Sequence, residues 1–316
     1  MPPQALTTGI EALDDLLGGV RVGDNVVWET DSGAPTDAFL APFVRAAGKG
    51  RQRVVFVSFN SSPQTALTRV RAWAAPADLT LLDCFTSGKG EGDPVFAAFY
   101  ESGEGQGSGS VVRVSSPANP GEVQSALAAL ERQHGPDRYV FDSLTGMLEL
   151  WAHEAQVLRF FAHVCPKLYD LRTVAYWLLE KGAHSESFLA NLKHITQVFI
   201  ELCIVEGKDQ LVPRKLVGRE NARIGVAHPF KVRDGQPDFG VAALGGGEEE
   251  ALRALGPRMR TLRQQRGLSQ ARVAEMAGLS PSAISQMESG AIRPSLTVLL
   301  RIALALGVGV NALLGE

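Results

Sequence analysis

The sequence predicts an α/β domain built on a mainly parallel sheet flanked by helices, followed by a small all-α domain of five short helices. Up to about residue 240, near-continuous apolar runs of strand length alternate with helical stretches, as in parallel sheets covered on both faces. From Pro257 onward, serine and glycine separate short helical segments at regular intervals. Charge divides the chain too: residues 251–316 carry +5, from eight arginines and three acidic residues, and the rest carries −8.

The composition is that of a soluble globular protein. A length of 316 residues is enough for two domains, and 45% of the residues are hydrophobic and 21% charged. The sequence contains no run of about eighteen apolar residues and no signal-like start, so we expect a cytoplasmic protein without membrane contact. Three widely spaced cysteines, Cys84, Cys165 and Cys203, lack metal-ligand spacing and are expected to be buried or half-buried thiols.

The larger domain is expected to contain six strands and at least three helices. The strands are predicted at residues 25–29, 53–59, 79–85, 138–143, 173–180 and 197–204, and the helices at 36–48, 120–135 and 153–171. Residues 101–110 are glycine-rich, but their glycines are too irregular for a nucleotide-binding fingerprint. This segment is therefore expected to be a flexible surface loop.

A linker is expected at residues 241–255, between a domain at 1–240 and a domain at 256–316. Three consecutive glycines give this segment a free backbone, and the acidic run that follows either starts a short helix or stays solvated. The small domain should then hold helices at 257–267, 269–278, 280–290, 295–307 and 310–316, with Ser269, Ser280 and Ser295 as N-caps. Its predicted core comprises Leu262, Val273, Ala274, Ala277, Leu279, Ile284, Met287, Leu296, Leu299, Leu300 and Leu306.

The stretch "LRQQRGLSQARVAEMAGLSPSAISQMESGAIRPSLTVLLRIALALGVGVNALL" resembles the lambda-repressor/Cro-like helix-turn-helix family, also called the xenobiotic-response-element type. The resemblance implies that the second helix of the motif enters the major groove of double-stranded DNA. Helical spacing turns Ile284 and Met287 to the core. It turns outward Ser282, Ala283, Ser285 and Gln286, which are expected to read bases or contact phosphates. The N-cap Ser280 is also expected among the DNA-binding residues.

The resemblance also assigns the DNA-backbone contacts. Gln270 matches the family's phosphate-contacting position, and Arg263, Arg266 and Arg293 are expected to reach the backbone, although each arginine can equally be a solvated surface charge. No lysine or arginine lies between Gly278 and Gly290, so direct reading of guanine by this helix is not expected. One motif reads about half a turn of duplex, so a palindromic operator and a homo-oligomer, most simply a dimer, are expected.

The larger domain resembles the KaiC/RadA branch of RecA-like ATPases over roughly residues 6–235. The resemblance rests on "LTTGIEALDDLLGGVRVGDNVVWE", "VVFVSFNSSPQTALTRVRAWA", "RYVFDSLTGM" and "GRENARIGVAHPFKVRDG", which follow one another in the order found in that branch. It implies a nucleotide site between the first core strand and the next helix. It also places Arg214, Arg219 and Arg223 where relatives present cations to a neighbour's nucleotide, or where they serve an interface instead.

The phosphate-loop pattern of that branch falls on Thr30 to Asp37, and its chemical residues are replaced. Thr30 and Pro35 replace two glycines, Thr36 replaces the lysine, and Asp37 replaces the magnesium-binding hydroxyl, while Gly33 is the single glycine left. Pro35 removes a backbone N–H that such a loop needs. The nucleotide site is therefore expected to be degenerate.

Two further features bear on the site. Glu29 and Asp31 add negative charge beside Asp37, and the three carboxylates are expected to repel a polyphosphate. Alternatively, Asp37 is present only because an aspartate stabilises the N-terminus of a helix. Asn60 stands where the resembling branch has a catalytic glutamate, and an amide does not accept a proton at neutral pH. Asp142 matches the metal-directed aspartate, but an aspartate that ends a central strand is also common without metal.

These residues lead to one preferred hypothesis and two alternatives. We expect a sequence-specific DNA-binding transcriptional regulator that is not an enzyme and needs no cofactor, in which a dead RecA-like domain serves oligomerisation, sensing or binding of a protein partner. The first alternative is a RecA-type ATPase or kinase that is targeted to DNA. The second is a DNA-tethered scaffold for another RecA-family protein. The small domain as a non-DNA interaction module also remains open.

Overall fold

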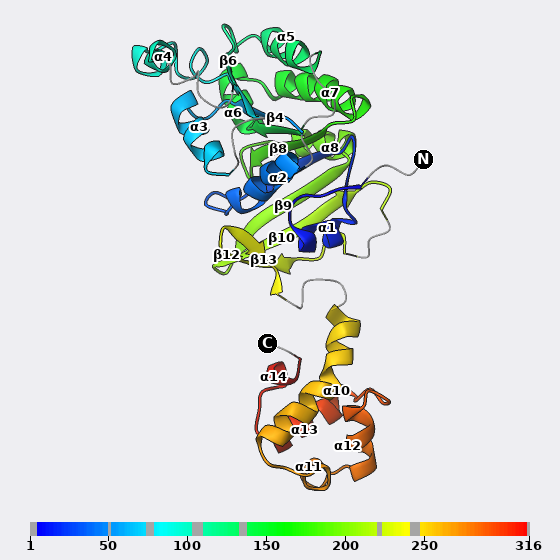
Figure 1. Ribbon diagram of the computed structural model, residues 1–316. Helices are drawn as coiled ribbons and strands as arrows, with labels where there is room; N and C mark the ends of the chain where they lie inside the picture. The colour runs from blue at the N-terminus through cyan, green and yellow to red at the C-terminus, as the bar shows by residue number, and fades with distance from the viewer. Residues whose placement is uncertain are drawn as a thin grey trace. The chain divides into compact units, whose positions relative to one another are not determined.

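The computed structural model describes residues 5–49, 52–73, 79–102, 110–132, 138–219, 223–240 and 247–314. It divides into two compact units, Met1–Asp238 and Phe239–Glu316. The first is an α/β unit and the second is entirely helical over its described residues (Figure 1). The expected fold class is confirmed.

A nine-stranded sheet runs through the α/β unit in the order β11-β10-β9-β3-β8-β7-β4-β5-β6. All neighbours from β9 to β6 are parallel, and only β10 and β11 are antiparallel to the strands beside them. The strands are β3 (Asn25–Thr30), β4 (Val54–Ser58), β5 (Leu79–Asp83), β6 (Ser110–Arg113), β7 (Arg138–Asp142), β8 (Val174–Glu180), β9 (Val198–Val205), β10 (Lys208–Leu216) and β11 (His228–Pro229). Two small hairpin-like pairs lie outside it: β1 (Ala5–Leu6) with β2 (Val20–Arg21), and β12 (Lys231–Arg233) with β13 (Gln236–Asp238).

Eight helices in the described residues accompany the sheet. They are α1 (Glu11–Leu17), α2 (Asp37–Lys49), α3 (Pro63–Arg71), α4 (Pro94–Glu101), α5 (Pro120–Glu131), α6 (Leu144–Trp151), α7 (Glu154–Asp170) and α8 (Glu186–Ile195). Successive side chains of the central strands point to opposite faces of the sheet, and each face packs in an apolar layer. Val27 of β3 joins a core made with α5, α6, α7 and α8, whereas its neighbour Trp28 packs on Phe39 of α2, with ring centroids 5.1 Å apart.

The six expected strands are confirmed, but the sequence did not predict β6, β10 or β11. β6 starts at Ser110, inside the segment expected to be a loop, and α4 extends to Glu101 at the other end of that segment; residues 103–109 lie outside the described part. β6 is a half-exposed edge strand with two apolar residues, and Pro213 with flanking charges interrupts β10. Both strands therefore lack the continuous apolar run that marks a buried parallel strand.

The helical unit contains the five expected helices. They are α10 (Gly247–Gln265), α11 (Gln270–Ala277), α12 (Pro281–Glu288), α13 (Leu296–Leu306) and α14 (Val310–Leu314). Ser269, Ser280 and Ser295 each accept a hydrogen bond from a backbone N–H in the first turn of the following helix, as expected of N-caps. Gly278 and Gly307 end α11 and α13 in the left-handed conformation, with φ of 65° and 61°.

The first of these helices begins earlier than the sequence analysis expected. α10 starts at Gly247 and runs through Pro257, so the second half of the expected linker at 241–255 is helical. The segment "EEEALRAL" consists of strong helix formers, and glutamates suit the positive end of a helix. Residues 241–246 lie outside the described residues. Gly256 lies against the backbone of α12, where a Cβ atom would come within 2.6 Å of the carbonyl oxygen of Met287.

Two residues of the expected core prove to be exposed. Leu296 and Leu300 are 69% and 46% exposed, and Leu304, one helical turn further, is 77% exposed. The three lie on one face of α13, while Ile302 and Leu306 on another face enter the core. The remaining expected core residues do pack in or against that core, which also includes Leu255, Met259, Ala303 and Leu313.

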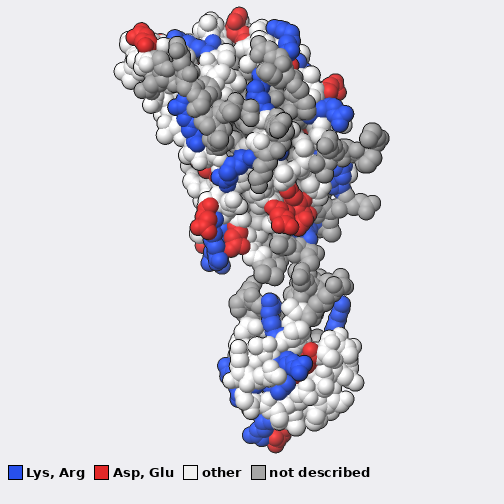
Figure 2. All heavy atoms as spheres, in the orientation of Figure 1, with Lys and Arg blue, Asp and Glu red and all other residues white. Residues whose placement is uncertain are grey.

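The described surface of the helical unit is rich in arginine. Figure 2 shows the basic side chains of the helical unit on the viewed face, with few acidic ones among them. The exposed arginines of this unit are Arg260, Arg266, Arg272, Arg293 and Arg301. Within the described ranges, every helix is too short or too polar to cross a membrane. All three cysteines are buried and free, and burial raises the pKa of the Cys165 thiol to about 12, as expected for inert thiols.

Candidate functional site

The phosphate-loop position lies between β3 and α2, at the carboxyl end of the parallel sheet. A loop of this kind binds phosphate when successive backbone N–H groups point at one anion. Here the N–H of Ala34 donates to the carbonyl oxygen of Asp31 at 3.0 Å, and the N–H of Thr36 donates to that of Ala34 at 2.8 Å. Pro35 has no N–H to offer. Two of the backbone N–H donors that a phosphate would need are therefore hydrogen-bonded within the loop.

The hydroxyl groups of the loop are also used internally. Thr36 Oγ1 donates to the carbonyl oxygen of Ala34 at 3.3 Å, and Thr30 Oγ1 donates to that of Leu179 on β8 at 3.3 Å. Gly33 is exposed, has φ of 85°, and has no heavy atom within 4 Å of the place a Cβ would take. Its role is thus the turn itself, because that backbone conformation favours glycine.

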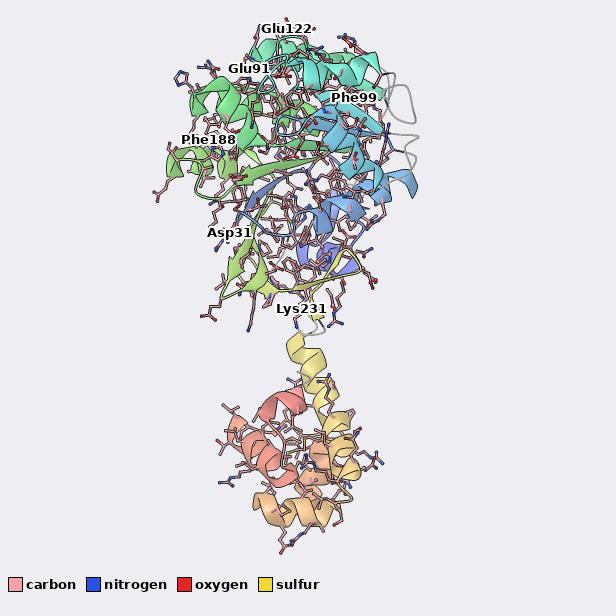
Figure 3. All side chains as sticks on the ribbon, turned by 90° about the vertical axis from the view of Figure 1, so that its left-hand side faces the viewer. Asp31, Glu91, Phe99, Glu122, Phe188 and Lys231 are labelled. Atoms are coloured by element: carbon pink, nitrogen blue, oxygen red, sulfur yellow. The ribbon has the colours of Figure 1, made fainter. Side chains whose placement is uncertain are left out.

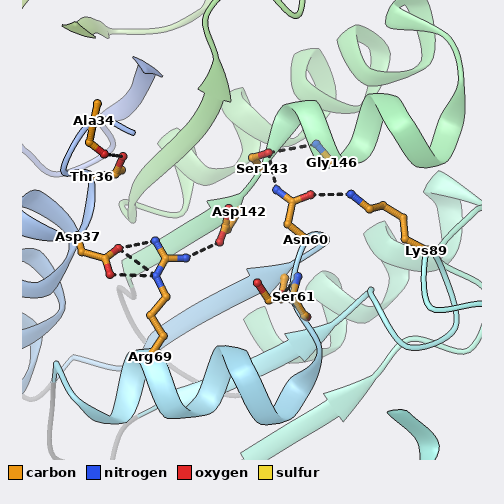
Figure 4. Close-up of polar contacts among 11 residues, drawn as sticks. Ala34, Thr36, Asp37, Asn60, Ser61, Arg69, Lys89, Asp142, Ser143 and Gly146 are labelled. Atoms are coloured by element: carbon orange, nitrogen blue, oxygen red, sulfur yellow. Dashed lines mark hydrogen bonds and ion pairs between the residues drawn. The ribbon is translucent and has the colours of Figure 1, made fainter. Parts of the chain in front are cut away.

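An arginine of α3 lies between the two aspartates expected at the site (Figure 4). The Arg69 guanidinium donates to Asp37 Oδ1 through Nε at 2.9 Å and Nη2 at 2.5 Å, and to Asp142 Oδ2 through Nη1 at 2.8 Å. Asp37 is the first residue of α2 and Asp142 the last of β7. The positions that would hold a magnesium ion through a hydroxyl and a carboxylate thus both bind one guanidinium.

The Arg69 side chain stays protonated. Burial alone would lower the pKa of Arg69, but the hydrogen bond to Asp37 and the charges of Asp142 and Asp37 outweigh it and raise the pKa. Arg69 also lies over the ring of Trp73, 5.0 Å from its centroid. Arg69 lies within one of the stretches that carry the resemblance to RecA-like ATPases, but no role was expected for it. No local signal marks it, since its partners lie 32 and 73 residues away.

Asn60, at the expected catalytic-glutamate position, is part of a second polar network. Its Nδ2 donates to Ser143 Oγ at 2.9 Å, and its Oδ1 accepts from Lys89 Nζ at 3.0 Å. Ser143 Oγ in turn accepts from the N–H of Gly146, and Lys89 also pairs with Glu149. Both ends of the amide are committed, and a Cβ at Gly146 would overlap Asn60 Oδ1. The arrangement tethers loops and offers no general base.

The negative charge that the sequence analysis expected to repel a polyphosphate is largely compensated. Asp37 binds Arg69, and Asp31, which follows β3 (Figure 3), has Lys181 Nζ at 3.7 Å. On β9, Glu201 binds both Lys181 and Arg214. The expected repulsion is therefore weaker than the sequence predicts, because Arg69, Lys181 and Arg214 pair with these carboxylates.

Glu29 differs from these paired carboxylates. It is buried beside Glu201, with which it is in register across β3 and β9. Burial raises the pKa of its carboxyl group, and the nearby charge of Lys193 only partly offsets this.

Two of the arginines that the resemblance placed near a neighbour's nucleotide have partners within the unit. Arg219 is buried and forms an ion pair with the buried Asp24, whereas Arg214 is exposed and binds Glu201. Both cations are thus engaged within the α/β unit. Over the described residues, no group of three or more histidine, cysteine, aspartate or glutamate side chains is arranged to hold a metal ion.

The second candidate site is the helix-turn-helix motif of α11 and α12. Ser282, Ser285 and Gln286 are exposed on α12, while Ile284 and Met287 are buried, as helical spacing predicts. Ala283, expected to face outward, is half-buried and packs on the core. Ser280 is exposed, and its Oγ accepts from the N–H of Ala283 at 3.1 Å, so it caps the helix.

A buried carboxylate joins three helices of this motif. Glu288 Oε1 accepts from Arg263 Nε at 2.6 Å, and its Oε2 accepts from Arg263 Nη2 at 3.0 Å and Gln270 Nε2 at 2.8 Å. Burial would raise the pKa of Glu288, but the hydrogen bonds from Arg263 and Gln270 outweigh it and lower the pKa. Arg263 and Gln270 fix α12 against α10 and α11. A buried carboxylate needs such partners. That Arg263 and Gln270 also reach the DNA backbone stays a prediction.

The other two expected backbone-contacting arginines are exposed. Arg266 lies near the carboxyl end of α13, where a Cβ at Gly307 would come within 2.7 Å of its Nη1. Arg293 follows α12 and lines a small cavity of about 240 Å³ with Leu255, Gly256 and Met287. Exposed Arg272 forms an ion pair with Glu275 at 2.7 Å. Arg266 and Arg293 therefore stay candidates for phosphate contacts.

Comparison with known proteins identifies the helical unit. Residues 259–313 match the helix-turn-helix family. The immunity repressor protein of Bacillus phage phi105 is 40% identical over 62 residues, which are 20% of this chain and 43% of the repressor. The HTH-type transcriptional regulator PuuR of Escherichia coli (strain K12) is 38% identical over 63 residues, 20% of this chain and 34% of PuuR. The chain thus spans less than half the length of these curated relatives.

The α/β unit has a structural neighbour of known fold. A KaiC-like protein from the hyperthermophilic archaeon Pyrococcus horikoshii OT3 superposes with a TM-score of 0.52 and 17% identity. The match covers 75% of this chain and 99% of that protein. At this level of identity the comparison shows the fold, which is the RecA-type, KaiC-like fold that the resemblance implied.

Proposed function

We propose that this chain, which joins a KaiC-like α/β unit to a helix-turn-helix domain, is a sequence-specific DNA-binding transcriptional regulator. The observation that carries the proposal is the exposed row of Ser282, Ser285 and Gln286 on α12. Buried Glu288 holds the last turn of that helix to α10 and α11. The matches to a phage repressor and to PuuR support the same conclusion.

The chemistry of α12 favours a particular kind of operator. The Gln286 amide can donate to N7 of adenine and accept from its exocyclic N6 amine, which is the usual paired contact of this side chain. The serine hydroxyls donate or accept as the base or phosphate requires. With no lysine or arginine on α12, we expect the bases under this helix to include adenine–thymine pairs, while exposed arginines such as Arg266 and Arg293 contact phosphates.

The α/β unit is proposed to act without nucleotide hydrolysis. The loop donors at Ala34 and Thr36 are bonded internally, Arg69 binds both Asp37 and Asp142, and Asn60 is not a base. These contacts support a unit that does not hydrolyse nucleotide. We propose that it instead assembles the chain, most simply into a dimer on a palindromic operator, and binds an effector or protein partner. Dimerisation is proposed because a single motif reads only half a site.

Selection from a random duplex library at physiological salt tests the regulator function. The full chain is expected to enrich one sequence family, with two half-sites about one helical turn apart. Retention of duplexes without any enriched sequence would reject the proposal, because phosphate contacts alone bind without sequence preference. A parallel phosphate-release assay with magnesium and ATP is expected to give only the background rate.

A further inference from the structure

We propose that Arg69 is a built-in cation that takes the place of a divalent metal ion between Asp37 and Asp142, and so closes the site to metal–nucleotide complexes. This inference deepens the proposed function and rests on its nucleotide-independent α/β unit. The residues present do not fit a magnesium–nucleotide complex, and the guanidinium is the reason. Figure 4 shows the group between the two carboxylates.

The geometry is that of a bridging cation. One edge of the guanidinium makes three hydrogen bonds to Asp37, at 2.9 and 3.2 Å from Nε and at 2.5 Å from Nη2, and the remaining nitrogen reaches Asp142 at 2.8 Å. Three N–H directions are thus matched to two carboxylates on different elements, which a planar guanidinium does and an ammonium group does not. An ion that entered between the aspartates would have to remove all four contacts.

Covalent attachment favours the arginine over any ion from solution. Arg69 is carried by α3, which is anchored by the buried side chains of Ala66, Leu67 and Val70. The guanidinium is therefore held next to its carboxylates at high effective concentration, without the loss of translational freedom that a free ion pays. Its side chain is 29% exposed, so water and ions do reach the place, and exclusion depends on competition.

The same contact closes the phosphate-binding end of α2. The N-terminus of a helix attracts anions, and Asp37 already supplies one there. Arg69 then pairs with this aspartate and fixes it in place. A phosphate would therefore meet an anion and a cation already bound to each other, with neither the loop donors nor a metal ion available to hold it.

Titration with Mn²⁺, followed by electron paramagnetic resonance, tests the inference in the full chain. The wild type is expected to bind no Mn²⁺ at this place. Arg69→Gln removes the charge and leaves both carboxylates, so it should bind Mn²⁺ saturably, at concentrations about tenfold or more below any at which the wild type shows binding. Adding Asp142→Asn should abolish that gain, and Mg²⁺ should raise the melting temperature of Arg69→Gln alone.

Two variants serve as controls. Arg71→Gln, on the same helix and exposed, should behave as the wild type does. Arg69→Lys keeps a positive charge at the place and should fold and exclude Mn²⁺ even where Arg69→Gln proves unstable. Mn²⁺ binding by Arg69→Lys as tight as by Arg69→Gln would overturn the inference.

Two other results would overturn it as well. One is saturable binding of Mn²⁺ to the wild type that Asp142→Asn removes. The other is a folded Arg69→Gln that binds no Mn²⁺. Arg69→Gln is expected to bind DNA as the wild type does. If the wild type itself bound no DNA sequence-specifically, that result would count against the proposed function and not against the role of Arg69.

Discussion

The carboxylate of Glu288 and the guanidinium of Arg263 make two hydrogen bonds inside the helix-turn-helix domain, at 2.6 and 3.0 Å. Their side chains are only 4% and 12% exposed. This pair, with Gln270, ties the end of α12 to the two helices before it. The direction in which α12 presents its outer face therefore depends on a contact made within the helical unit.

Replacing Glu288 with alanine should destabilise the helical unit by roughly 2–3 kcal/mol, because it leaves a buried arginine without its partner. Urea unfolding followed by circular dichroism measures this loss. Glu275→Ala removes an exposed ion pair with Arg272 and should cost at most about 1 kcal/mol. Equal losses in the two variants would contradict the role given to Glu288.

Acid should weaken the same contact. The pKa of Glu288 is lowered in the folded chain, so its contribution is complete above the carboxyl pKa of the unfolded chain, about 4.3. That contribution is lost as the pH falls through the lower folded value. Glu288→Gln should therefore lose stability relative to wild type at pH 7, and the gap should narrow towards pH 3. A gap that does not change with pH would contradict this account.

Glu29 should show the opposite sign. Burial raises its pKa, so the folded state binds the proton more tightly than the unfolded state and stability falls as the pH rises through that range. Glu29→Gln should stabilise the α/β unit at pH 7 and have little effect at pH 4. All four tryptophans lie in this unit, so tryptophan fluorescence during urea unfolding reports on it. The exposed Glu180 at the end of β8 provides the control variant Glu180→Gln, which should be near neutral at both pH values.

Gly146 and Gly48 form a matched pair. A Cβ at Gly146 would overlap Asn60 Oδ1, so Gly146→Ala should cost roughly 1–3 kcal/mol as the Asn60 network shifts. Gly48 lies within α2 with no atom within 4 Å of its Cβ position, so Gly48→Ala should stabilise by about 0.5–1 kcal/mol. Thermal unfolding followed by tryptophan fluorescence measures both, and a harmless Gly146→Ala would show that Asn60 is free to move.

Gln286 should decide sequence preference. Gln286→Ala is expected to lose about 1–3 kcal/mol of discrimination at one base pair of the selected operator and to keep its salt dependence. Gln264→Ala, at an exposed position of α10, is the control and should leave both unchanged. Fluorescence anisotropy with single-base operator variants measures the difference. If Gln286→Ala weakened binding equally on all operator variants, Gln286 would instead contact a phosphate.

Most of the fold was predictable, because the signals are local. Buried parallel strands such as β3 and β4 are continuous apolar runs, and the caps at Ser269, Ser280 and Ser295 mark each helix start. The features that the sequence did not predict depend on tertiary packing. The edge strand β6 has little apolar content, and whether a leucine of α13 is exposed or buried cannot be told from the residue type.

The candidate sites were predictable in position but less so in their contacts. The strand–loop–helix at Thr30–Asp37 and the outward row on α12 follow from motif spacing. The partners do not, since Arg69 meets Asp142 from 73 residues away and Arg263 meets Glu288 from 25 residues away. Long charged side chains reach several ångströms, so the sequence alone did not indicate that Arg263 binds Glu288 or that Arg69 binds Asp142.

The most direct test is the affinity of the full chain for its selected operator against a scrambled duplex of equal length, at physiological salt, with and without magnesium and ATP. The account predicts a ratio of dissociation constants of about 10³ or more, the same in both conditions. A ratio near one, or a ratio that appears only with ATP, would contradict it.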